Sequence, residues 1–381
     1  MAVLAGDGED ASGDDGIDRV LVVNAGSSSI KLRVLDRSDA VAAAADLPTA
    51  RGEVDRVAVA DAVRSFGDVD AVGHRIVHGG TAYSGPVVVD AGVVRRLEAL
   101  TDLAPLHQPK SLSALAAVSQ ALPDVPAVAC FDTAFHAAMP DAATTYALPR
   151  EWRRRWDLRR YGFHGLSHAH ASRRAAAMVG QPVERLRIVS CHLGAGASLA
   201  AVAGGRSVDT TMGFTPLEGL VMATRSGTVD PGLVLWLADH VGMPPAELAA
   251  TLEHRSGLQG LAGTPDMREV LARAAARDGA AMLARDVYVH RLRSSIAAMT
   301  ASLGGIDVLL FTGGVGENAA EIRARAVDGL AFLGLRLDGE ANATPELDAR
   351  VEAADSGAAI LVIRAREDLE ITREVRTLLG H

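Results

Sequence analysis

Apolar and polar residues alternate on either side of a tight turn near the start of the chain. Residues 20–23 (VLVV) are continuously apolar, and in residues 30–34 apolar side chains alternate with Lys31 and Arg33. Between them lies NAGSSS at residues 24–29, a turn with one glycine and three serines. The pattern predicts a β-hairpin. Its backbone N–H groups and hydroxyls suit a bound polyanion, although a single hairpin of this kind is more often a plain polar turn.

A second copy of the pattern favours the interpretation that these hairpin turns bind a polyanion. Residues 187–202 (RIVSCHLGAGASLAAV) again run from an apolar strand through a turn of small residues into a second apolar strand. A third apolar run at 308–311 leads into the glycine-rich stretch TGGVGEN at 312–318, which predicts another turn. Strand-then-glycine turns that recur far apart in the chain predict duplicated domains that face one nucleotide.

The remaining pattern alternates strands with helices and therefore predicts an α/β fold. Residues 40–63 are expected to hold a short strand and a helix. Further strands are predicted at 69–80, 125–130 and 359–363, and helices at 91–103, 111–122, 169–179, 233–240, 245–254, 278–303 and 368–379. Residues 207–231 are rich in glycine and threonine and show little periodicity, which is typical of a functional loop.

Length and composition narrow the class of protein. A chain of 381 residues suits two domains, and a net charge of −9 argues against nucleic-acid binding. The apolar stretches are only strand-length, so we expect no membrane-spanning helix. Two cysteines fit a reducing cytoplasm and no disulfide framework. Residues 1–16, acidic and glycine-rich, are expected to be a disordered extension, and the basic run at 152–160 a solvated helix face.

Several side chains that carry chemistry lie at strand ends or in irregular loops. They are two arginines, two histidines, one aspartate and two oxygen ligands from opposite ends of the chain: Arg75, Arg225, His164, His192, Asp132, Asn24 and Glu367. This set suits phosphoryl transfer, which needs cations and backbone donors around the moving group and a hard metal held by oxygen. An ion-pair role for the arginines and a helix-capping role for Asp132 are the structural alternatives.

Other motifs have simpler interpretations. Cys191 lies inside an apolar strand, where a cysteine is usually a small hydrophobic residue and not a nucleophile. His168 and His170 resemble a metal-ligand pair, but no third ligand stands at a useful spacing. The chain contains no GxxxxGK[ST] loop, so it is not a P-loop enzyme.

The motifs together resemble the acetate kinase family. They are VLVVNAGSSSIKLRV, AVGHRIVHGG, LAPLHQP, ACFDTAFHAAMP, RRYGFHGLSH, SCHLGAGAS, DTTMGFTPLEGL, TRSGTVDPG, FTGGVGEN and REDLEI, which occur in the family's order from residue 20 onward. The resemblance implies two duplicated actin-like (ribonuclease H-like) α/β domains flanking a nucleotide cleft, and a homodimer. It also implies that ATP and acetate react reversibly to ADP and acetyl phosphate, with Mg²⁺ (or Mn²⁺), in a cytoplasmic enzyme. The expected domains are 17–148 plus 368–381 and, for the nucleotide, 149–367.

The resemblance also implies roles for individual residues. Asp132, His164 and Arg225 match the catalytic residues, with Asp132 expected to orient Arg225, the metal or water. Arg75 matches the residue that binds the substrate carboxylate, and the pocket around the acetate methyl matches Val77, Leu106, Phe163 and Pro216. Asn24 and Glu367 match the metal site. The nucleotide contacts match Ser27, Ser29, Lys31, His192, Leu193, Gly194, Ala195, Gly196, Asp266, Met267, Arg268, Gly314, Val315, Gly316, Glu317 and Asn318.

The chain departs from the family pattern at three places. Ala195 stands where the family has asparagine, Thr228 where it usually has an acid, and Arg364-Ala365-Arg366 where proline-threonine-asparagine is usual. Three alternatives therefore stay open beside an acetate kinase. They are a propionate or butyrate kinase, a kinase with another phosphoryl donor, and a non-catalytic nucleotide-binding protein of the actin fold.

Overall fold

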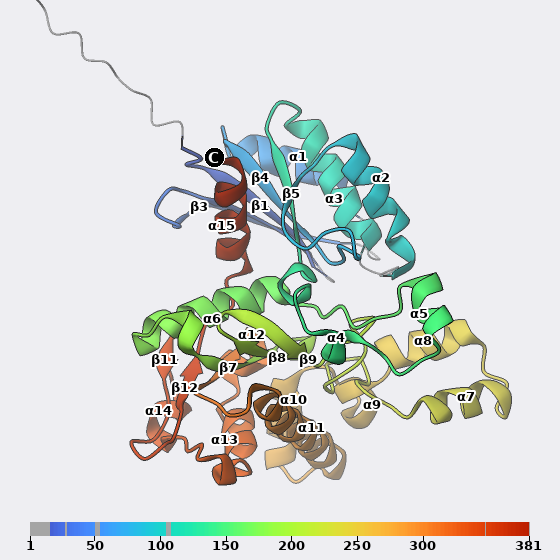
Figure 1. Ribbon diagram of the computed structural model, residues 1–381, viewed down its shortest axis with the longest axis vertical. Coiled ribbons are helices and arrows are strands. Elements are labelled where there is room, and N and C mark those ends of the chain that lie inside the picture. The colour runs from blue at the N-terminus through green and yellow to red at the C-terminus, as the bar shows by residue number, and fades with distance from the viewer. Residues whose placement is uncertain (1–15, 27–28, 50–53, 104–107, 347, 381) are drawn as a thin grey trace, which may run out of the picture.

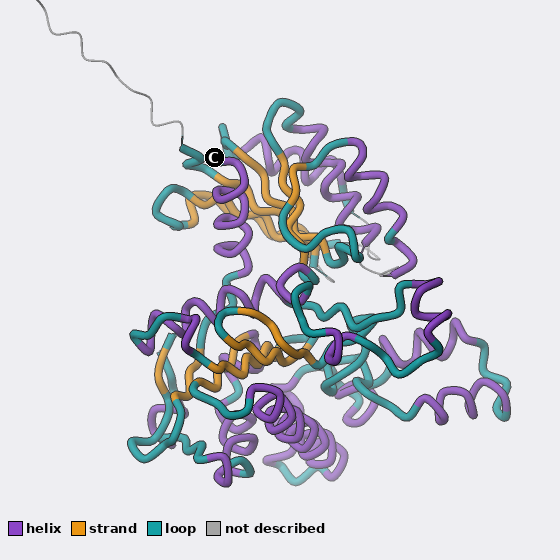
Figure 2. The backbone as a smooth tube through the Cα atoms, viewed as in Figure 1, coloured by secondary structure: helices purple, strands orange, loops and turns teal. Residues whose placement is uncertain are grey.

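The computed structural model describes residues 16–26, 29–49, 54–103, 108–346 and 348–380, and its strands gather in two groups, one in each half of the molecule (Figures 1 and 2). Ser27, Leu106 and nearly all of the expected N-terminal extension lie outside these residues. Each group is a six-stranded mixed sheet. The first contains β1 (Val20–Ala25), β2 (Ser29–Leu35), β3 (Val41–Pro48), β4 (Ala71–Ile76), β5 (Val87–Val88) and β6 (Ala127–Phe131). The second contains β7 (Arg187–Leu193), β8 (Ala197–Ala203), β9 (Arg206–Thr210), β10 (Val308–Thr312), β11 (Ala349–Arg350) and β12 (Ala359–Val362).

The two sheets have the same topology. The strand order is β3-β2-β1-β4-β6-β5 in the first sheet and, read in the same sense, β9-β8-β7-β10-β12-β11 in the second. In both, the first three strands form an antiparallel meander, the next two join it in parallel, and the last is an antiparallel edge strand. The two hairpins predicted from sequence are therefore equivalent elements, and the prediction of duplicated α/β domains is confirmed.

Helices cover the sheets, and several begin at an aspartate whose carboxylate accepts hydrogen bonds from the first turn. The α-helices are α1 (Arg56–Ser65), α2 (Ala91–Ala99), α3 (Gln108–Ala121), α4 (Asp141–Thr144), α5 (Arg150–Trp156), α6 (Gly165–Val179), α7 (Pro231–Asp239), α8 (Pro245–His254), α9 (Gly257–Ala262), α10 (Met267–Ala275), α11 (Gly279–Leu303), α12 (Gly313–Asn318), α13 (Ala320–Asp328), α14 (Gly339–Ala343) and α15 (Glu367–Leu379). None of the helices in the described residues is both long enough and apolar enough to cross a membrane.

The end of the chain returns to the first sheet. Helix α15 packs on β1 and β4, and it also contacts α6, which lies on β7 and β10 of the second sheet (Figure 1). Gly73 in β4 allows this approach, because a Cβ there would meet the side chains of Ile371 and Val375. Residues separated by the whole length of the sequence thus meet between the two sheets.

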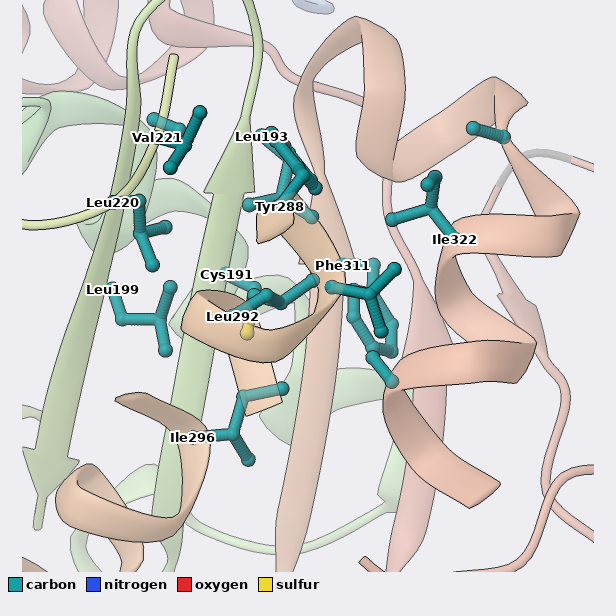
Figure 3. Packing of buried hydrophobic residues seen from close by; sticks show 14 of the residues in the cluster. Cys191, Leu193, Leu199, Leu220, Val221, Tyr288, Leu292, Ile296, Phe311 and Ile322 are labelled. Carbon is teal, nitrogen blue, oxygen red and sulfur yellow. The ribbon is translucent and has the colours of Figure 1, made fainter. Parts of the chain in front are cut away.

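The largest core surrounds α11. Figure 3 shows Leu292 and Ile296 of this helix packed near Cys191 and Leu199, which belong to β7 and β8. Cys191 is fully buried, and burial raises the pKa of its thiol. It is therefore a small apolar core residue, as the sequence pattern predicts.

Some boundaries differ from the predictions. Helix α6 begins at Gly165 instead of Ala169, because the Gly165 N–H donates to the Asp132 carbonyl, 2.9 Å away, and docks the helix there. The stretch predicted as a third glycine turn forms the short helix α12, whose first N–H, that of Gly313, is bound by the Glu317 carboxylate at 3.0 Å. Glycine has a low helix propensity, so periodicity does not reveal this helix. The segment 207–231, expected to be irregular, begins within β9, and its residues 211–230 contain no helix or strand, as predicted.

Candidate active site

The carboxyl ends of β1, β4 and β6 in the first sheet and of β7 in the second lie around one cavity of about 280 Å³. Ligands of open α/β sheets bind at this edge. We name it the charged cavity, because cations and carboxylates from both halves of the chain line it. Its lining includes thirteen of the predicted site residues: Asn24, Lys31, Arg75, Val77, Asp132, Phe163, His164, His192, Ala195, Gly196, Pro216, Arg225 and Glu367.

Arg75 connects the acidic groups of this cavity. Its Nε and Nη2 atoms donate to the two carboxylate oxygens of Asp132 at 2.9 and 2.6 Å. Its Nη1 donates to Asn24 Oδ1 at 3.0 Å, and Asn24 Nδ2 in turn donates to Glu367 Oε2 at 2.8 Å. Asp132 was expected to orient Arg225, the metal or water; its direct side-chain partner is Arg75.

Burial and charge act in opposite directions on these groups. Burial raises the pKa of Asp132, although the paired Arg75 guanidinium opposes the rise. Burial also acts to raise the pKa of Glu367, but Arg75 and His192 together bring it below its usual value. Burial disfavours a charged Arg75, yet the Asp132 and Glu367 carboxylates outweigh that effect and raise its pKa. Arg75 therefore stays charged and has two carboxylates to neutralise.

Two histidines and an arginine form the opposite wall. The rings of His164 and His192 stack with centroids 4.4 Å apart, and Arg225 Nη1 donates to the Pro216 carbonyl at 2.9 Å. A Cβ on Gly196 would lie 3.1 Å from His164 Nε2 and 3.6 Å from Arg225 Nη1. Burial is the main reason that the pKa of His164 lies well below its usual value, and the charges of His192 and Arg75 lower it further. His164 is therefore neutral near pH 7, while Arg225 supplies the positive charge.

Part of the lining of the charged cavity is apolar. Val77, Phe163 and Pro216 line it, and the first two are almost completely buried. An apolar surface beside the Arg75 guanidinium suits a small molecule with one carboxylate and a short hydrocarbon part.

A larger cavity of about 790 Å³ adjoins the charged cavity. Ala195 lines both, so the two spaces meet at the turn between β7 and β8. Eight of the predicted nucleotide residues line the large cavity: Gly194, Ala195, Asp266, Met267, Arg268, Gly314, Val315 and Asn318. Its apolar surface also includes Leu258, Leu271 and Tyr288, which the sequence analysis missed because each lies in a helix with ordinary core spacing.

The other predicted nucleotide residues that the structure describes do not line the large cavity. Leu193 and Gly316 are buried in the core beneath it. The Glu317 carboxylate accepts hydrogen bonds from the Gly313 and Ala365 N–H groups, and so it holds α12 and the β12–α15 connection together. Ser29 begins β2 and lines neither cavity.

His168 is buried between serines, and the described residues contain no cluster of three histidine, cysteine or acidic side chains that could hold a metal.

Two sheets of identical topology, with a small charged cavity joined to a larger apolar one between their strand ends, define a two-domain phosphotransferase of the actin-like class. The model of the acetokinase family matches residues 54–373. The chain belongs to the acetokinase family. The family uses ATP or ADP as a substrate.

Relatives match over most of their length. The acetate kinase of Geobacillus kaustophilus is 38% identical over 397 residues, which cover 94% of this chain and 99% of the relative. That of Nostoc punctiforme is 48% identical over 313 residues, 82% of this chain and 77% of the relative. Among solved structures, Porphyromonas gingivalis acetate kinase has a TM-score of 0.87 at 33% identity, covering 95% of this chain and 100% of that chain. A Francisella tularensis propionate kinase has a TM-score of 0.87 at 34% identity, covering 94% and 99%.

The buried histidines predict that acid destabilises the protein. Burial lowers the pKa of His74 to about 3 and that of His78, His136 and His170 to about 4. Below pH 6.5 the unfolded chain binds protons that the folded chain excludes. The contribution of these histidines to the free energy of unfolding is therefore complete above pH 6.5 and is lost as the pH falls. Each histidine contributes up to about 1.4 kcal/mol per pH unit.

Urea unfolding between pH 7.5 and 5 measures this effect. The free energy of unfolding should decrease as the pH is lowered. The slope of this free energy against pH should be smaller in His74→Leu by the equivalent of about one proton. A wild-type free energy of unfolding that does not change between pH 7.5 and 5.5 would contradict the prediction.

Proposed function

We propose that this protein transfers the γ-phosphoryl group of ATP to acetate, giving acetyl phosphate and ADP in a reversible reaction. The observation that carries the proposal is the pair of cavities that meet at Ala195. The charged cavity has a buried guanidinium beside an apolar surface, which suits a short carboxylate, and the large cavity has the size and apolar lining that suit an adenosine group.

In this proposal Arg75 binds the acetate carboxylate while Val77, Phe163 and Pro216 surround its methyl group. A carboxylate oxygen attacks the γ-phosphorus and forms the new P–O bond. The bond from the γ-phosphorus to the bridging oxygen of ADP breaks, and ADP leaves with that electron pair. Little covalent chemistry falls to the protein, so positioning the two substrates supplies much of the rate enhancement.

His164 and Arg225 stabilise the phosphoryl oxygens in the transition state. Both lie against Gly196, whose lack of a side chain leaves space next to His164 Nε2 and Arg225 Nη1. Arg225 supplies positive charge, and the neutral His164 supplies a hydrogen bond.

Asp132 does not act as a general base in this mechanism. The acetate carboxylate carries no proton to remove at neutral pH, and both Asp132 oxygens accept hydrogen bonds from Arg75. The role of Asp132 is to hold the Arg75 guanidinium in the plane that binds substrate.

The oxygen donors of Asn24 and Glu367 fit Mg²⁺ (or Mn²⁺). Mg²⁺ is usually bound by one or two carboxylates together with substrate phosphates, and these residues lie at the charged cavity with Asp132. Arg364 and Arg366 replace residues that are usual in the family, but Glu367 still lies at the cavity, where its carboxylate accepts a hydrogen bond from Asn24. When bound, the ion would neutralise charge on the nucleotide phosphates.

We also propose the domain division 17–148 with 368–381 and 149–367. The contacts of α15 with β1 and β4 support joining the chain's end to the first sheet. A cytoplasmic location accords with Cys130 and Cys191, which are both free and buried.

Acyl phosphate formation tests the function. The protein is mixed with ATP, Mg²⁺ and either acetate, propionate or butyrate, and the product is trapped with hydroxylamine. We expect acetate to react at least as fast as propionate. Faster reaction with propionate would favour the alternative that the Francisella tularensis neighbour suggests, since one methylene in an apolar pocket changes specificity only about 10- to 200-fold. Absence of product with all three acids would overturn the proposal.

Replacing Arg225 should abolish turnover and spare ATP binding. Its charge is needed mainly in the transition state, so Arg225→Ala should lower kcat by roughly 10³-fold or more while calorimetry gives a similar Kd for ATP. Arg336→Ala, at a surface arginine whose side chain is 55% exposed, is the control. Turnover of Arg225→Ala within a few-fold of wild type would rule out this role.

Restoring the family asparagine at position 195 should improve catalysis. Ala195 is exposed where the two cavities meet, so an amide fits there and can donate to a phosphate. Ala195→Asn should raise kcat or lower the KM for ATP by about 10- to 100-fold, the value of one hydrogen bond to a charged group. Ala195→Leu has the size of asparagine without the amide and should give no gain. Equal effects of the two substitutions would show that the amide is not responsible.

A homodimer is proposed from the exposed apolar face of α7. This helix has no buried residue, and Leu233, Leu235 and Trp236 are 48%, 70% and 51% exposed. Contiguous apolar surface of this kind usually marks an interface. Leu235→Glu should convert the dimer to a monomer by sedimentation equilibrium, whereas Phe332→Glu, at an exposed residue outside α7, should not. A wild-type protein that sediments as a monomer would refute the proposal.

A further inference from the structure

Four side chains behind the charged cavity form one continuous row of hydrogen bonds. Ser190 Oγ lies 2.8 Å from His168 Nδ1, and His168 Nε2 lies 2.8 Å from Ser198 Oγ. Ser198 Oγ then lies 2.9 Å from His164 Nδ1. Ser190, His168 and Ser198 are completely buried, so water does not complete or interrupt the row.

Three different elements build this row. Ser190 lies in β7 and Ser198 in the paired strand β8, while His168 lies in α6. His168 follows His164 by one helical turn, and its N–H donates to the His164 carbonyl at 3.0 Å. The two imidazoles therefore share one side of α6, with Ser198 between them.

The single hydroxyl proton of Ser198 gives the row a direction. Ser198 faces a ring nitrogen of each histidine, and it can donate to only one of them. If it donates to His164 Nδ1, then it accepts from His168 Nε2–H, and Ser190 donates to His168 Nδ1. The proton of His164 is then on Nε2. The reverse direction leaves Nε2 of His164 with a lone pair and no proton.

The surroundings of His164 Nε2 favour the first direction. This atom faces the space beside Gly196, next to Arg225 Nη1. A phosphoryl group bound there presents only acceptor oxygens, which a lone pair would repel. A doubly protonated His164 is disfavoured by burial and by the charges of Arg75 and Arg225.

The neighbouring histidine is held in the same way. His192 Nδ1 lies 2.7 Å from Ser167 Oγ, and its ring stacks on that of His164. The stacking fixes the plane of the His164 ring, and the serine row fixes its rotation within that plane.

We propose that Ser198 and His168 are positioning residues, which hold His164 in the neutral form with its proton on Nε2, directed at the transferred phosphoryl group. The proton stays on His164 throughout, so the row orients a donor and does not transfer protons. This inference rests on the proposed phosphoryl transfer for its catalytic consequence.

The Ser198→Ala variant tests the inference by kinetics. We expect kcat to fall roughly 10- to 100-fold, because the His164 ring loses the hydrogen bond that fixes both its tautomer and its orientation toward the phosphoryl group, with KM values for acetate and ATP changed less than about 3-fold. Ser207→Ala is the matched control: Ser207 is equally buried and lies 2.8 Å from His136 Nδ1, but it is outside the row. Its kcat should stay within about 2-fold of wild type. A Ser198→Ala kcat within 2-fold of wild type, or an equal loss in Ser207→Ala, would overturn the inference.

His168 offers a second, conservative comparison. A glutamine amide can replace Nε2–H as the donor to Ser198, whereas leucine cannot. His168→Gln should therefore retain more kcat than His168→Leu at similar KM values. If the two variants lose the same activity while both remain folded by circular dichroism, His168 has only a packing role and the inference fails.

Nitrogen NMR of ¹⁵N-histidine-labelled protein tests the tautomer without any turnover. In the wild type, the His164 signals, assigned by their loss in His164→Gln, should show a protonated Nε2 and an unprotonated Nδ1. In Ser198→Ala the two tautomers should mix. A wild-type signal with the proton on Nδ1 would overturn the inference even if the enzyme is active. Absence of turnover in the wild type would refute the proposed function, while the spectrum would still decide the tautomer.

Discussion

The structure of the site depends on one buried guanidinium. Arg75 contacts Asp132 and Asn24 and lies near Glu367, and these partners come from the residue after β6, from β1 and from the start of α15. Breaking a buried ion pair by removing one partner typically costs 3–5 kcal/mol, because the remaining charge is left unpaired. The three partners are therefore held where a single cation can serve them all, and this draws the two ends of the chain together.

This arrangement leaves Arg75 with one positive charge against two carboxylates. A substrate carboxylate that approaches Arg75 would add a third, and Lys31 and Arg225, which line the same cavity, supply the opposing positive charge. Both halves of the chain contribute to this balance, Lys31, Arg75 and Asp132 from the first and Arg225 and Glu367 from the second.

The duplicated topology assigns different tasks to equivalent elements. The strand ends of the first sheet carry Arg75 and Asp132, which hold charge, and Asn24, whose amide hydrogen-bonds to Arg75. The strand ends of the second sheet carry His192, Ala195 and α12, which border the large cavity or the space beside it. Helix α6 connects the halves, since Gly165 at its start is bonded to the Asp132 carbonyl and its first residues carry the histidine row.

Local pattern determined much of this protein. Alternation and glycine turns predict the two hairpins, the α/β class and the duplication, because strand and turn preferences act over a few residues. The candidate residues at strand ends also follow from sequence, since parallel strands place their carboxyl ends at one edge. The early start of α6 and the helical form of α12 do not follow, because a bond to Asp132 and the Glu317 carboxylate overcome the low helix propensity of glycine. Only the tertiary structure decided that Arg75 pairs with Asp132, that Ser198 separates His164 from His168, and that Ala195 joins two cavities, since each depends on residues far apart in the chain whose distance no local preference encodes.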